Sequence, residues 1–439
     1  MTVGSSGLAG VSRRLSAAWG VAFAAALIFA LNLGTRQSMG LFVGDLNTST
    51  GLGLVGVSLA FAVSQIAWGI AQPFAGAAAD RYGPAPVVAL GCVLVALGAW
   101  LTPRMDSVGG LVVTIGILGA VGSGMAGPAV LMSATARLLP AEKVGAANAV
   151  VNAGGSLGQF VMAPVAGLLI AGLGWAAAMQ ALGLLVLAAL PAVTALRGTA
   201  RPDAAGASAA TAPLTSREAL RRARAVPGYW LLNAGFFICG FHIAFLSTHL
   251  PGVVAQCGLP PRVAAWSLGV LGLSNVAGSL AMGWAVGRWR MKSLLALVYA
   301  TRGVAVLLFL AAPKTETVVL AFAAVMGATF LATVPPTAGL VARLFGPSNM
   351  AMLFGMVMLS HQVGGFLGAW LGAQSFVATG SYDALWRADA LLAFTAALLH
   401  LPIREAPPRR ADGGVAGEAA TTPCAHEGRR PIEKVRRRR

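Results

Sequence analysis

Charged residues and paired cysteines are scarce in this sequence. Only 10% of its 439 residues are Asp, Glu, Lys or Arg, and 57% are hydrophobic, whereas a globular domain carries about 25% charged residues. The four cysteines form no CxxC pair, and no GxxxxGK[ST] loop is present. These absences exclude a water-soluble fold and argue against a disulfide framework, a metal site, a cofactor or an ATP-driven activity.

The excess of positive charge lies outside the apolar runs. The net charge is +17, which in a soluble protein would suggest nucleic acid, but such binding needs a basic face on a folded, water-facing domain. Here the Lys and Arg residues gather in 197–227 and 404–439. We therefore expect no nucleic-acid partner, and a solvated tail whose Arg436–Arg439 run at most touches anionic lipid.

Twelve apolar runs are long enough to cross a bilayer core, which needs about 20 residues. The first is far longer than a signal-peptide core and no small-residue cleavage site follows it, so we expect it to be retained as a helix. The runs are 16–44, 53–76, 84–102, 108–138, 145–171, 175–196, 228–250, 263–287, 293–312, 318–343, 348–379 and 385–402.

Three sequence patterns recur at nearly one spacing, 206 to 210 residues apart. This recurrence predicts two related six-helix halves, an arrangement common in transporters whose substrate site lies between the halves. The pairs are Ala136–Pro140 with Ala342–Pro347, Gly76–Arg81 with Gly283–Arg288, and Gly154–Gly158 with Gly364–Gly368.

The same patterns divide the chain into five parts. We predict a cytoplasmic N-terminal segment, an N-terminal half, a cytoplasmic linker, a C-terminal half and a basic cytoplasmic tail. Their bounds are 1–15, 16–196, 197–227, 228–403 and 404–439.

Four motifs resemble a known group. The loop Gly76-xxx-Asp80-Arg81-Tyr82-Gly83 resembles the signature loop of the major facilitator superfamily, and Ala147-x-Ala149-x-Val151-x-Ala153-Gly154 is similar to the fifth-helix signature of the monocarboxylate transporter family. Arg36-Gln37-Ser38 and Ser360-His361-Gln362 resemble its bacterial relatives. The resemblance implies an all-α membrane protein with twelve transmembrane helices in two pseudo-symmetric six-helix halves.

One departure from that family concerns the eighth run. Carboxylate carriers of the family often place an acid and an arginine four residues apart there, and the matching positions here are Asn275 and Ser279. Either another cation binds the anion or the substrate is not a simple carboxylate.

Two arginines lie inside apolar runs, where a charge costs about 2.5–3.5 kcal/mol and should face protein or water. Arg36 is expected to bind substrate, with Asn32 one turn before it on the same helix face. Outward snorkelling is the alternative for Arg36. Arg302 is expected to cap carbonyls of a neighbouring helix, although it could instead replace the missing anion-binding arginine.

Three histidines complete the expected substrate site. His242 and His249 are seven residues apart on one face of the seventh run, and His361 stands beside Gln362 in the eleventh. Ordinary hydrogen-bonded packing is the alternative for each. Because Asp45, Asp383 and Asp389 all fall near the outer ends of runs, proton coupling is expected to use histidine, above all His242, rather than a carboxylate.

Gating and packing residues are expected at the cytoplasmic side and within the helices. Asp80 and Arg81, with Arg137 as a partner, are expected to hold the cytoplasmic side closed. Gly154-Gly155-Ser156-Leu157-Gly158 matches the GxSxG pattern of hydrolases by letters, but a mid-helix position excludes that strand-turn-helix chemistry. Helix packing is the better interpretation of its glycines and of their echoes. The packing residues are Gly154, Gly158, Gly364 and Gly368.

The leading hypothesis is a secondary active transporter that moves a small organic anion such as a monocarboxylate by alternating access, with possible coupling to protons. Efflux of amphipathic drugs is the alternative, since a cavity with few fixed cations suits apolar compounds. A membrane enzyme would need a convergent catalytic set, and none is evident. We expect a monomer in the cell inner membrane.

The distribution of Lys and Arg predicts the orientation. With both termini in the cytoplasm, the inside loops hold 25 of the 31 Lys and Arg residues and the outside loops hold four. Reporter fusions near Ala205 and at the C-terminus should therefore both report a cytoplasmic location. A fusion at either place that reports an external location would exclude the twelve-span arrangement.

Overall fold

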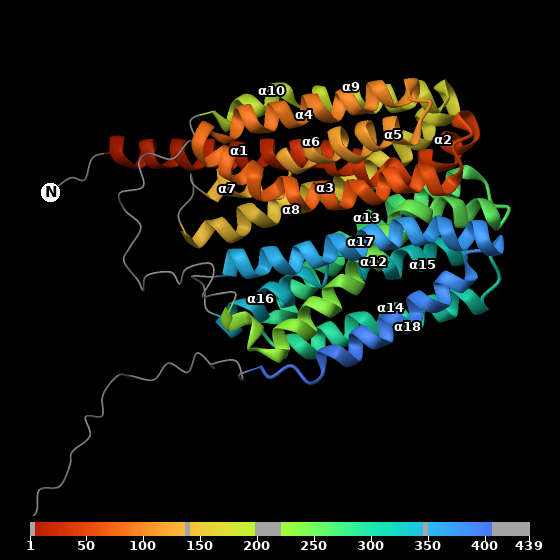
Figure 1. Cartoon of the computed structure of the whole chain (residues 1–439). Helices are drawn as coiled ribbons and strands as arrows, with labels where there is room; N and C mark the ends of the chain where they lie inside the picture. Colours follow the sequence, from red (N-terminus) through yellow and green to blue (C-terminus); the bar gives the residue numbers. More distant parts are fainter. Residues whose placement is uncertain (1–4, 137–140, 198–220, 346–349, 406–439) are drawn as a thin grey trace, which may run out of the picture. The chain divides into compact units, whose positions relative to one another are not determined.

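The computed structural model describes residues 5–136, 141–197, 221–345 and 350–405. These residues form helices joined by short turns, in the order predicted (Figure 1). Parts of the predicted segments 1–15, 197–227 and 404–439 lie outside the described residues, and this division of the chain stays a prediction.

The N-terminal half contains six spans, four of which consist of more than one helical element. Their elements are α1 (Ser5–Ser38) with η1 (Met39–Phe42) and α2 (Val43–Thr50); α3 (Leu54–Tyr82); α4 (Pro84–Leu101) with η2 (Thr102–Arg104); α5 (Val108–Leu111), η3 (Val112–Gly119), α6 (Ala120–Met125) and α7 (Pro128–Ala136); α8 (Ala141–Leu173); and α9 (Trp175–Leu187), α10 (Leu190–Val193) and η4 (Thr194–Leu196).

The C-terminal half repeats this order. Its elements are α12 (Pro227–Gln256), α13 (Pro261–Val286), α14 (Met291–Ala311), α15 (Glu316–Thr329) with α16 (Val334–Phe345), α17 (Met350–Thr379) and α18 (Asp383–His400).

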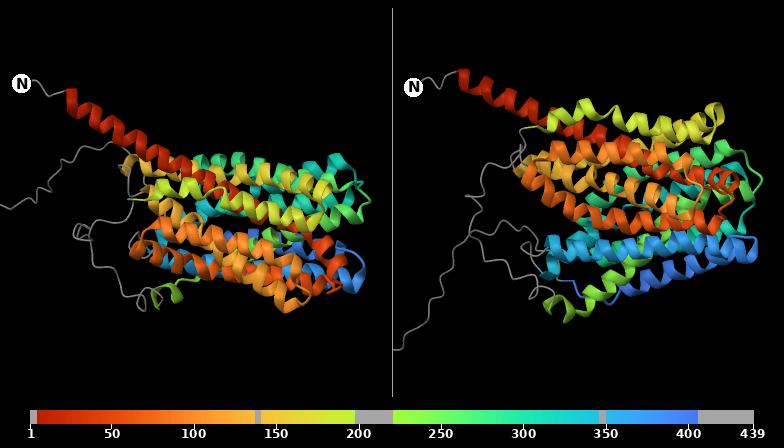
Figure 2. Two further views of the ribbon diagram at one scale, coloured as in Figure 1. Left: turned by 90° about the horizontal axis from the view of Figure 1, so that it is seen from above. Right: turned by 45° about the horizontal axis from the view of Figure 1, so that its top comes forward.

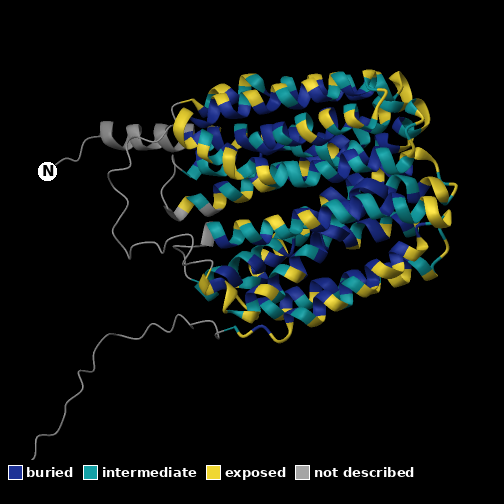
Figure 3. Cartoon of the chain, in the orientation of Figure 1, coloured by how far each residue is buried: buried dark blue, intermediate teal, exposed yellow. Residues whose placement is uncertain are grey.

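Eleven helical segments of the described chain are long and apolar enough to cross a membrane. The twelfth span, α18, has 18 residues and carries Asp383, Arg387 and Asp389. Large apolar side chains remain exposed on the helices, among them Phe74 at 72% and Leu168 at 74%, and Figure 3 shows exposed positions scattered along both halves. A lipid environment accounts for such exposure, so the predicted all-α membrane fold is confirmed.

Backbone punctuation sets several helix boundaries. Gly83 adopts a φ of 86°, a region that favours glycine, and Pro84 then occupies the first turn of α4, where its missing N–H costs nothing. Pro128 begins α7 after a break in the fourth span, and α15 and α16 are separated by a similar break before Pro335 and Pro336.

The tightest helix pairs are formed through glycine. A Cβ atom added at Gly154 or Gly158 of α8 would collide with the backbone of α1, at Ala26 and Ala30 respectively. Cβ atoms at Gly364 and Gly368 of α17 would collide in the same way with Phe237 and Phe241 of α12. The two pairs occupy equivalent positions in the two halves and run side by side in Figures 1 and 2.

The end of α18 is tied to its neighbours by one carboxylate. Glu405 accepts hydrogen bonds from the backbone N–H groups of Met291 and Lys292 at 3.1 Å each, at the first turn of α14, and pairs with Arg343 of α16 at 2.6 Å. A carboxylate at a helix N-terminus is favoured by the helix dipole.

Glycine packing in α17 can be tested within one helix. Gly364→Ala should lower the Tm of the purified protein, because overpacking costs about 1–3 kcal/mol. Gly355→Ala is the matched control, since a Cβ there meets no atom within 4 Å; it should leave the Tm unchanged or raise it slightly, as Ala is favoured in helices by about 0.5–1 kcal/mol. Equal Tm values for the two variants would contradict the close approach of α17 and α12.

Candidate substrate site

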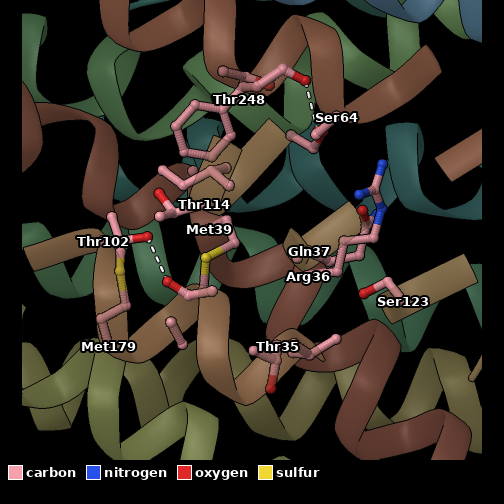
Figure 4. A pocket seen from close by; sticks show the side chains of 18 of the residues that line it. Thr35, Arg36, Gln37, Met39, Ser64, Thr102, Thr114, Ser123, Met179 and Thr248 are labelled. Carbon is pink, nitrogen blue, oxygen red and sulfur yellow. Dashed lines mark hydrogen bonds between the residues drawn. The ribbon is translucent and has the colours of Figure 1, made fainter. Parts of the chain in front are cut away.

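A pocket lies mainly among helices of the N-terminal half and is completed by two residues of α12. Its volume is about 700 Å³, part of it open to solvent, and Figure 4 shows its lining from close by. The polar lining groups are Thr35, Arg36, Gln37, Ser64, Gln65, Thr102, Thr114, Ser123, Ser247 and Thr248, and the larger apolar ones are Met39, Phe61, Val95, Ile115 and Met179.

Arg36 is the one charged residue among those lining groups. It is half-buried near the end of α1, and its Nη2 donates to Gln65 Oε1 at 2.8 Å. Its guanidinium also lies 5.1 Å from the ring centroid of Trp68, a cation–π distance. Among the described residues no carboxylate pairs with Arg36, so its charge stays available to an anion.

The wall opposite Arg36 depends on close contacts between the halves. A Cβ at Gly40 would collide with the carbonyl oxygen of Ser247, so the chain of η1 lies directly against α12. Gly69 of α3 is packed in the same way against Gln362 of α17. These contacts bring Ser247 and Thr248 to a pocket that otherwise belongs to the N-terminal half.

Part of the fourth span is a π-helix, and residues of this π-helix line the pocket. Residues Val112–Gly119 form η3, and Thr114, Ile115 and Gly119 within it line the pocket. Such segments are rare and are found disproportionately at functional sites.

Asn32 forms hydrogen bonds at the break in the fourth span and does not line the pocket. Its Nδ2 donates to the carbonyl oxygens of Ser123 and Ala126 at 3.0 Å each, and its Oδ1 accepts from Ser123 Oγ at 2.9 Å. The carbonyls belong to the end of α6, where Pro128 interrupts the helix. The structure therefore separates Asn32 from Arg36, which the sequence had placed together.

Arg302 caps the corresponding break in the tenth span. It is 1% exposed, and its guanidinium donates to the carbonyl oxygens of Thr329 and of Phe330, the latter at 2.9 Å, and to Cys239 Sγ at 3.3 Å. These carbonyls lie at the end of α15. This geometry matches the capping role considered for Arg302, and the residue does not line the pocket.

Asn275 of α13 also forms a hydrogen bond at the break in the tenth span. Its Oδ1 accepts from the backbone N–H of Leu331 at 3.1 Å, and its Nδ2 donates to Ser156 Oγ of α8 at 2.9 Å. Asn275, which stands where the family often has an acid, thus forms a hydrogen bond between the two halves.

His242 faces α18 instead of the pocket. Its Nδ1 lies 2.6 Å from Asp389 Oδ1, and both side chains are 1% exposed. The expectation that Asp389 falls near an outer end, leaving no carboxylate in the core, is wrong. Asp389 already lay within the predicted run 385–402, but the sequence does not show which face of α18 turns inward.

The other expected histidines also lie away from the pocket. His249 Nε2 lies 2.7 Å from the carbonyl oxygen of Ala369, and its ring packs against Tyr382 at a centroid distance of 5.5 Å. Burial raises the pKa of Tyr382, in the turn before α18, to about 12. His361 packs against Phe236 at 5.0 Å, and buried Gln362 fills the space beside Gly69.

Two of the three expected gating residues belong to the described part of the chain. Asp80 and Arg81 end α3, both exposed, and the Arg81 guanidinium lies 5.2 Å from the Tyr82 ring. Arg137 lies outside the described residues. Their role in gating stays a prediction.

Sequence reasoning missed Gln65, Trp68, Ser64 and Thr248. Gln65 and Trp68 lie on α3, three residues apart and therefore on one helix face, and both contact Arg36. A polar and an indole side chain at that spacing in an apolar run were the available signal. Ser64 and Thr248 carried no signal of their own.

Comparison with known proteins decides the family. The profile of the Major Facilitator Superfamily matches residues 18–321 and 252–439. The chain belongs to this superfamily. Major facilitator proteins are transporters rather than an enzyme class, so the chain is a multi-pass membrane protein with a small-molecule substrate.

Relatives of this major facilitator protein include monocarboxylate transporters. It is 27% identical to monocarboxylate transporter 13 of Rattus norvegicus over 392 residues, covering 88% of this chain and 89% of that one. It is 28% identical to monocarboxylate transporter 11 of Mus musculus over 390 residues, covering 83% of each. It is 22% identical to the uncharacterized MFS-type transporter YcxA of Bacillus subtilis (strain 168), covering 74% and 80%. The resemblance seen in the motifs is confirmed.

A solved structure supports the fold of this major facilitator protein. The bacterial homolog of the human lysosomal transporter Spinster, in an inward-facing and unoccupied conformation, superimposes with a TM-score of 0.66 at 15% identity, covering 89% of this chain and 99% of that one. At this identity the similarity shows the fold alone.

The capping role of Arg302 predicts a stability defect. Arg302→Met should lower the Tm of the purified protein, because charged hydrogen bonds contribute about 1.5–3 kcal/mol and the carbonyls of Thr329 and Phe330 would lose their partner. Arg262→Met, at a side chain that is 70% exposed, is the control and should change the Tm little. An unchanged Tm for Arg302→Met would show that the break in the tenth span does not need this arginine.

Proposed function

We propose that this protein is a secondary active transporter that takes up a small organic anion, such as a monocarboxylate, by alternating access of its two halves. The observation that carries the proposal is Arg36, a cation at the pocket whose side-chain contacts within the described chain, Gln65 and Trp68, are both uncharged. In a pocket of low dielectric a single uncompensated charge attracts an anion through a weakly screened field.

The surrounding groups suit a small oxygen-rich anion. Hydroxyl groups of Ser64, Thr114 and Thr248 line the same pocket and can donate to carboxylate or hydroxyl oxygens. Phe61 and Met179 add apolar surface for a short carbon chain. The named monocarboxylate transporters among the relatives support the same substrate class.

Binding at this pocket also provides a route to alternating access. Ser247 and Thr248 come from the C-terminal half, whereas Arg36 and the other lining residues come from the N-terminal half. A substrate held by Arg36 and by these hydroxyls would contact both halves at once. The proposed location is the cell inner membrane with both termini in the cytoplasm, and the proposed state is monomeric.

Efflux of amphipathic drugs is the competing function. It draws on the apolar part of the pocket lining and on the absence of the family's arginine from the position of Ser279. Growth of a host strain without uptake systems on organic acids, compared with drug resistance of the same strain, separates the two functions.

Removal of the cation tests the proposal directly. Arg36→Gln should abolish uptake of the organic acid found by the growth screen and leave the amount of protein in the membrane unchanged. Arg36→Lys should retain part of the activity, because it keeps the charge but loses the planar fork. The control is Arg104→Gln, at an exposed arginine in η2. Normal uptake by Arg36→Gln would contradict the proposed transport of organic anions and favour drug efflux.

A further inference from the structure

The contact between α12 and α18 places an imidazole against a carboxylate in an apolar part of the molecule. His242 Nδ1 and Asp389 Oδ1 approach to 2.6 Å. Within the described chain neither side chain makes a hydrogen bond of good geometry, with the other or with a third residue. The surrounding cluster is aromatic and aliphatic, and includes Phe241, Phe245 and Trp386.

Burial of this kind is costly for a charge without partners. An ionised carboxylate in an apolar setting is stabilised only by an opposite charge or by hydrogen bonds. Two acidic side chains of the described residues are only 1% exposed, Asp389 and Glu405. Glu405 pairs with Arg343 and accepts from two backbone N–H groups, whereas the close polar contact of Asp389 is His242. The charge of the pair therefore depends on how many protons the two side chains hold.

One other charge lies near the pair. Arg302 of α14 donates to Cys239, which is one turn before His242 on α12. The imidazole and the carboxylate can share a proton across their contact, so they take up and release it as one unit.

The remaining ionisable groups on the neighbouring helices have other partners or lie toward helix ends. His249 contacts Ala369, and α13 has no ionisable residue within its described length after Arg262, which pairs with Glu316 of α15 at 3.6 Å. The others on elements packed against α12 or α18 are Asp45 on α2, Asp80, Arg81 and Tyr82 on α3, Lys292 and Tyr299 on α14, Arg343 on α16, His361 on α17, and Tyr229, Asp383, Arg387 and His400 on α12 and α18 themselves.

The same helix connects the pair to the pocket. Ser247 and Thr248, which line the pocket, are five and six residues from His242 on α12, or about 8–9 Å along the helix axis. At Gly40 the backbone of η1 lies directly against the carbonyl oxygen of Ser247. A shift of α12 that loosens its contact with α18 would therefore also move a wall of the pocket.

We infer that the His242–Asp389 pair binds the proton that is coupled to transport, as one unit shared by α12 and α18. This inference rests on the proposed function, because coupling has meaning only for a transporter. The pair is closed to solvent in this conformation, so a proton enters or leaves only when α12 moves. Proton binding and substrate binding then act on one helix, and by reciprocity each changes the affinity for the other by the same factor.

The proton site can be tested without a substrate. The chain has five histidines, so ¹⁵N-histidine labelling of the full-length protein in nanodiscs gives few signals, and His242→Gln identifies the signal of His242 by its loss. We expect the chemical shifts of this signal to change with pH as the pair takes up and releases its proton. In Asp389→Asn this response to pH should differ from that of the unaltered protein, because the carboxylate that contacts the imidazole has been replaced.

Matched variants separate the pair from general effects. Asp383→Asn removes an exposed carboxylate from the same helix and should leave the response of His242 to pH unchanged. The double variant His242→Gln with Asp389→Asn leaves no unpaired charge, and should be folded even if a single variant is not. A His242 signal that does not respond to pH, or whose response is the same in Asp389→Asn, would overturn the proton site.

Transport then tests the coupling. Liposomes containing the protein should take up radiolabelled lactate, a monocarboxylate probe, faster under an inward proton gradient. The double variant should exchange lactate without this acceleration, whereas Asp383→Asn should keep it. Acceleration that persists in the double variant overturns the inference. Absence of any lactate uptake by the unaltered protein counts against the proposed function instead, and the titration still decides whether the pair binds a proton.

Discussion

The absence of water from a bilayer core requires every backbone polar group there to find a partner within the protein. The fourth and tenth spans are the places where this requirement is hardest to meet, because each is broken and leaves groups that no helix satisfies. Asn32 holds the carbonyls freed in the fourth span. Arg302 and Asn275 hold the carbonyls and an N–H group freed in the tenth. Three of the few strongly polar side chains inside the spans are thus committed to structure.

This commitment explains how the remaining polar groups divide between the halves. With Asn32 and Arg302 engaged, Arg36 is left as the cation at the pocket, and it lies in the N-terminal half. The buried carboxylate and imidazole lie together in the C-terminal half. The charge of Arg36 at the pocket and the buried contact of His242 with Asp389 therefore lie on separate halves, which meet where η1 contacts α12.

Hydrophobic run length and Gly and Pro punctuation were sufficient to predict the helices, their order and the repeat of the halves, since these depend on properties local in the chain. The approach of Gly154 and Gly364 to neighbouring helices also followed from local pattern. Partners across helices did not. That Asn32 faces α6, or that His242 faces Asp389, depends on the rotation of each helix about its axis. In α12 and α18, where apolar residues surround the whole helix, no sequence periodicity reports that rotation.

The hydrogen bond from Asn275 to Ser156 joins α13 to α8, and thus one half to the other, within the membrane-spanning region. Interhelical hydrogen bonds in membrane proteins contribute about 0.6 kcal/mol on average and about 1.7 kcal/mol at most. A bond present in only one of two conformations changes their population ratio by about three-fold to twenty-fold at these energies. In an alternating-access cycle that separates α13 from α8, the hydrogen bond between Asn275 and Ser156 would therefore favour the conformation seen here by this modest factor, and thermal motion would suffice to break it.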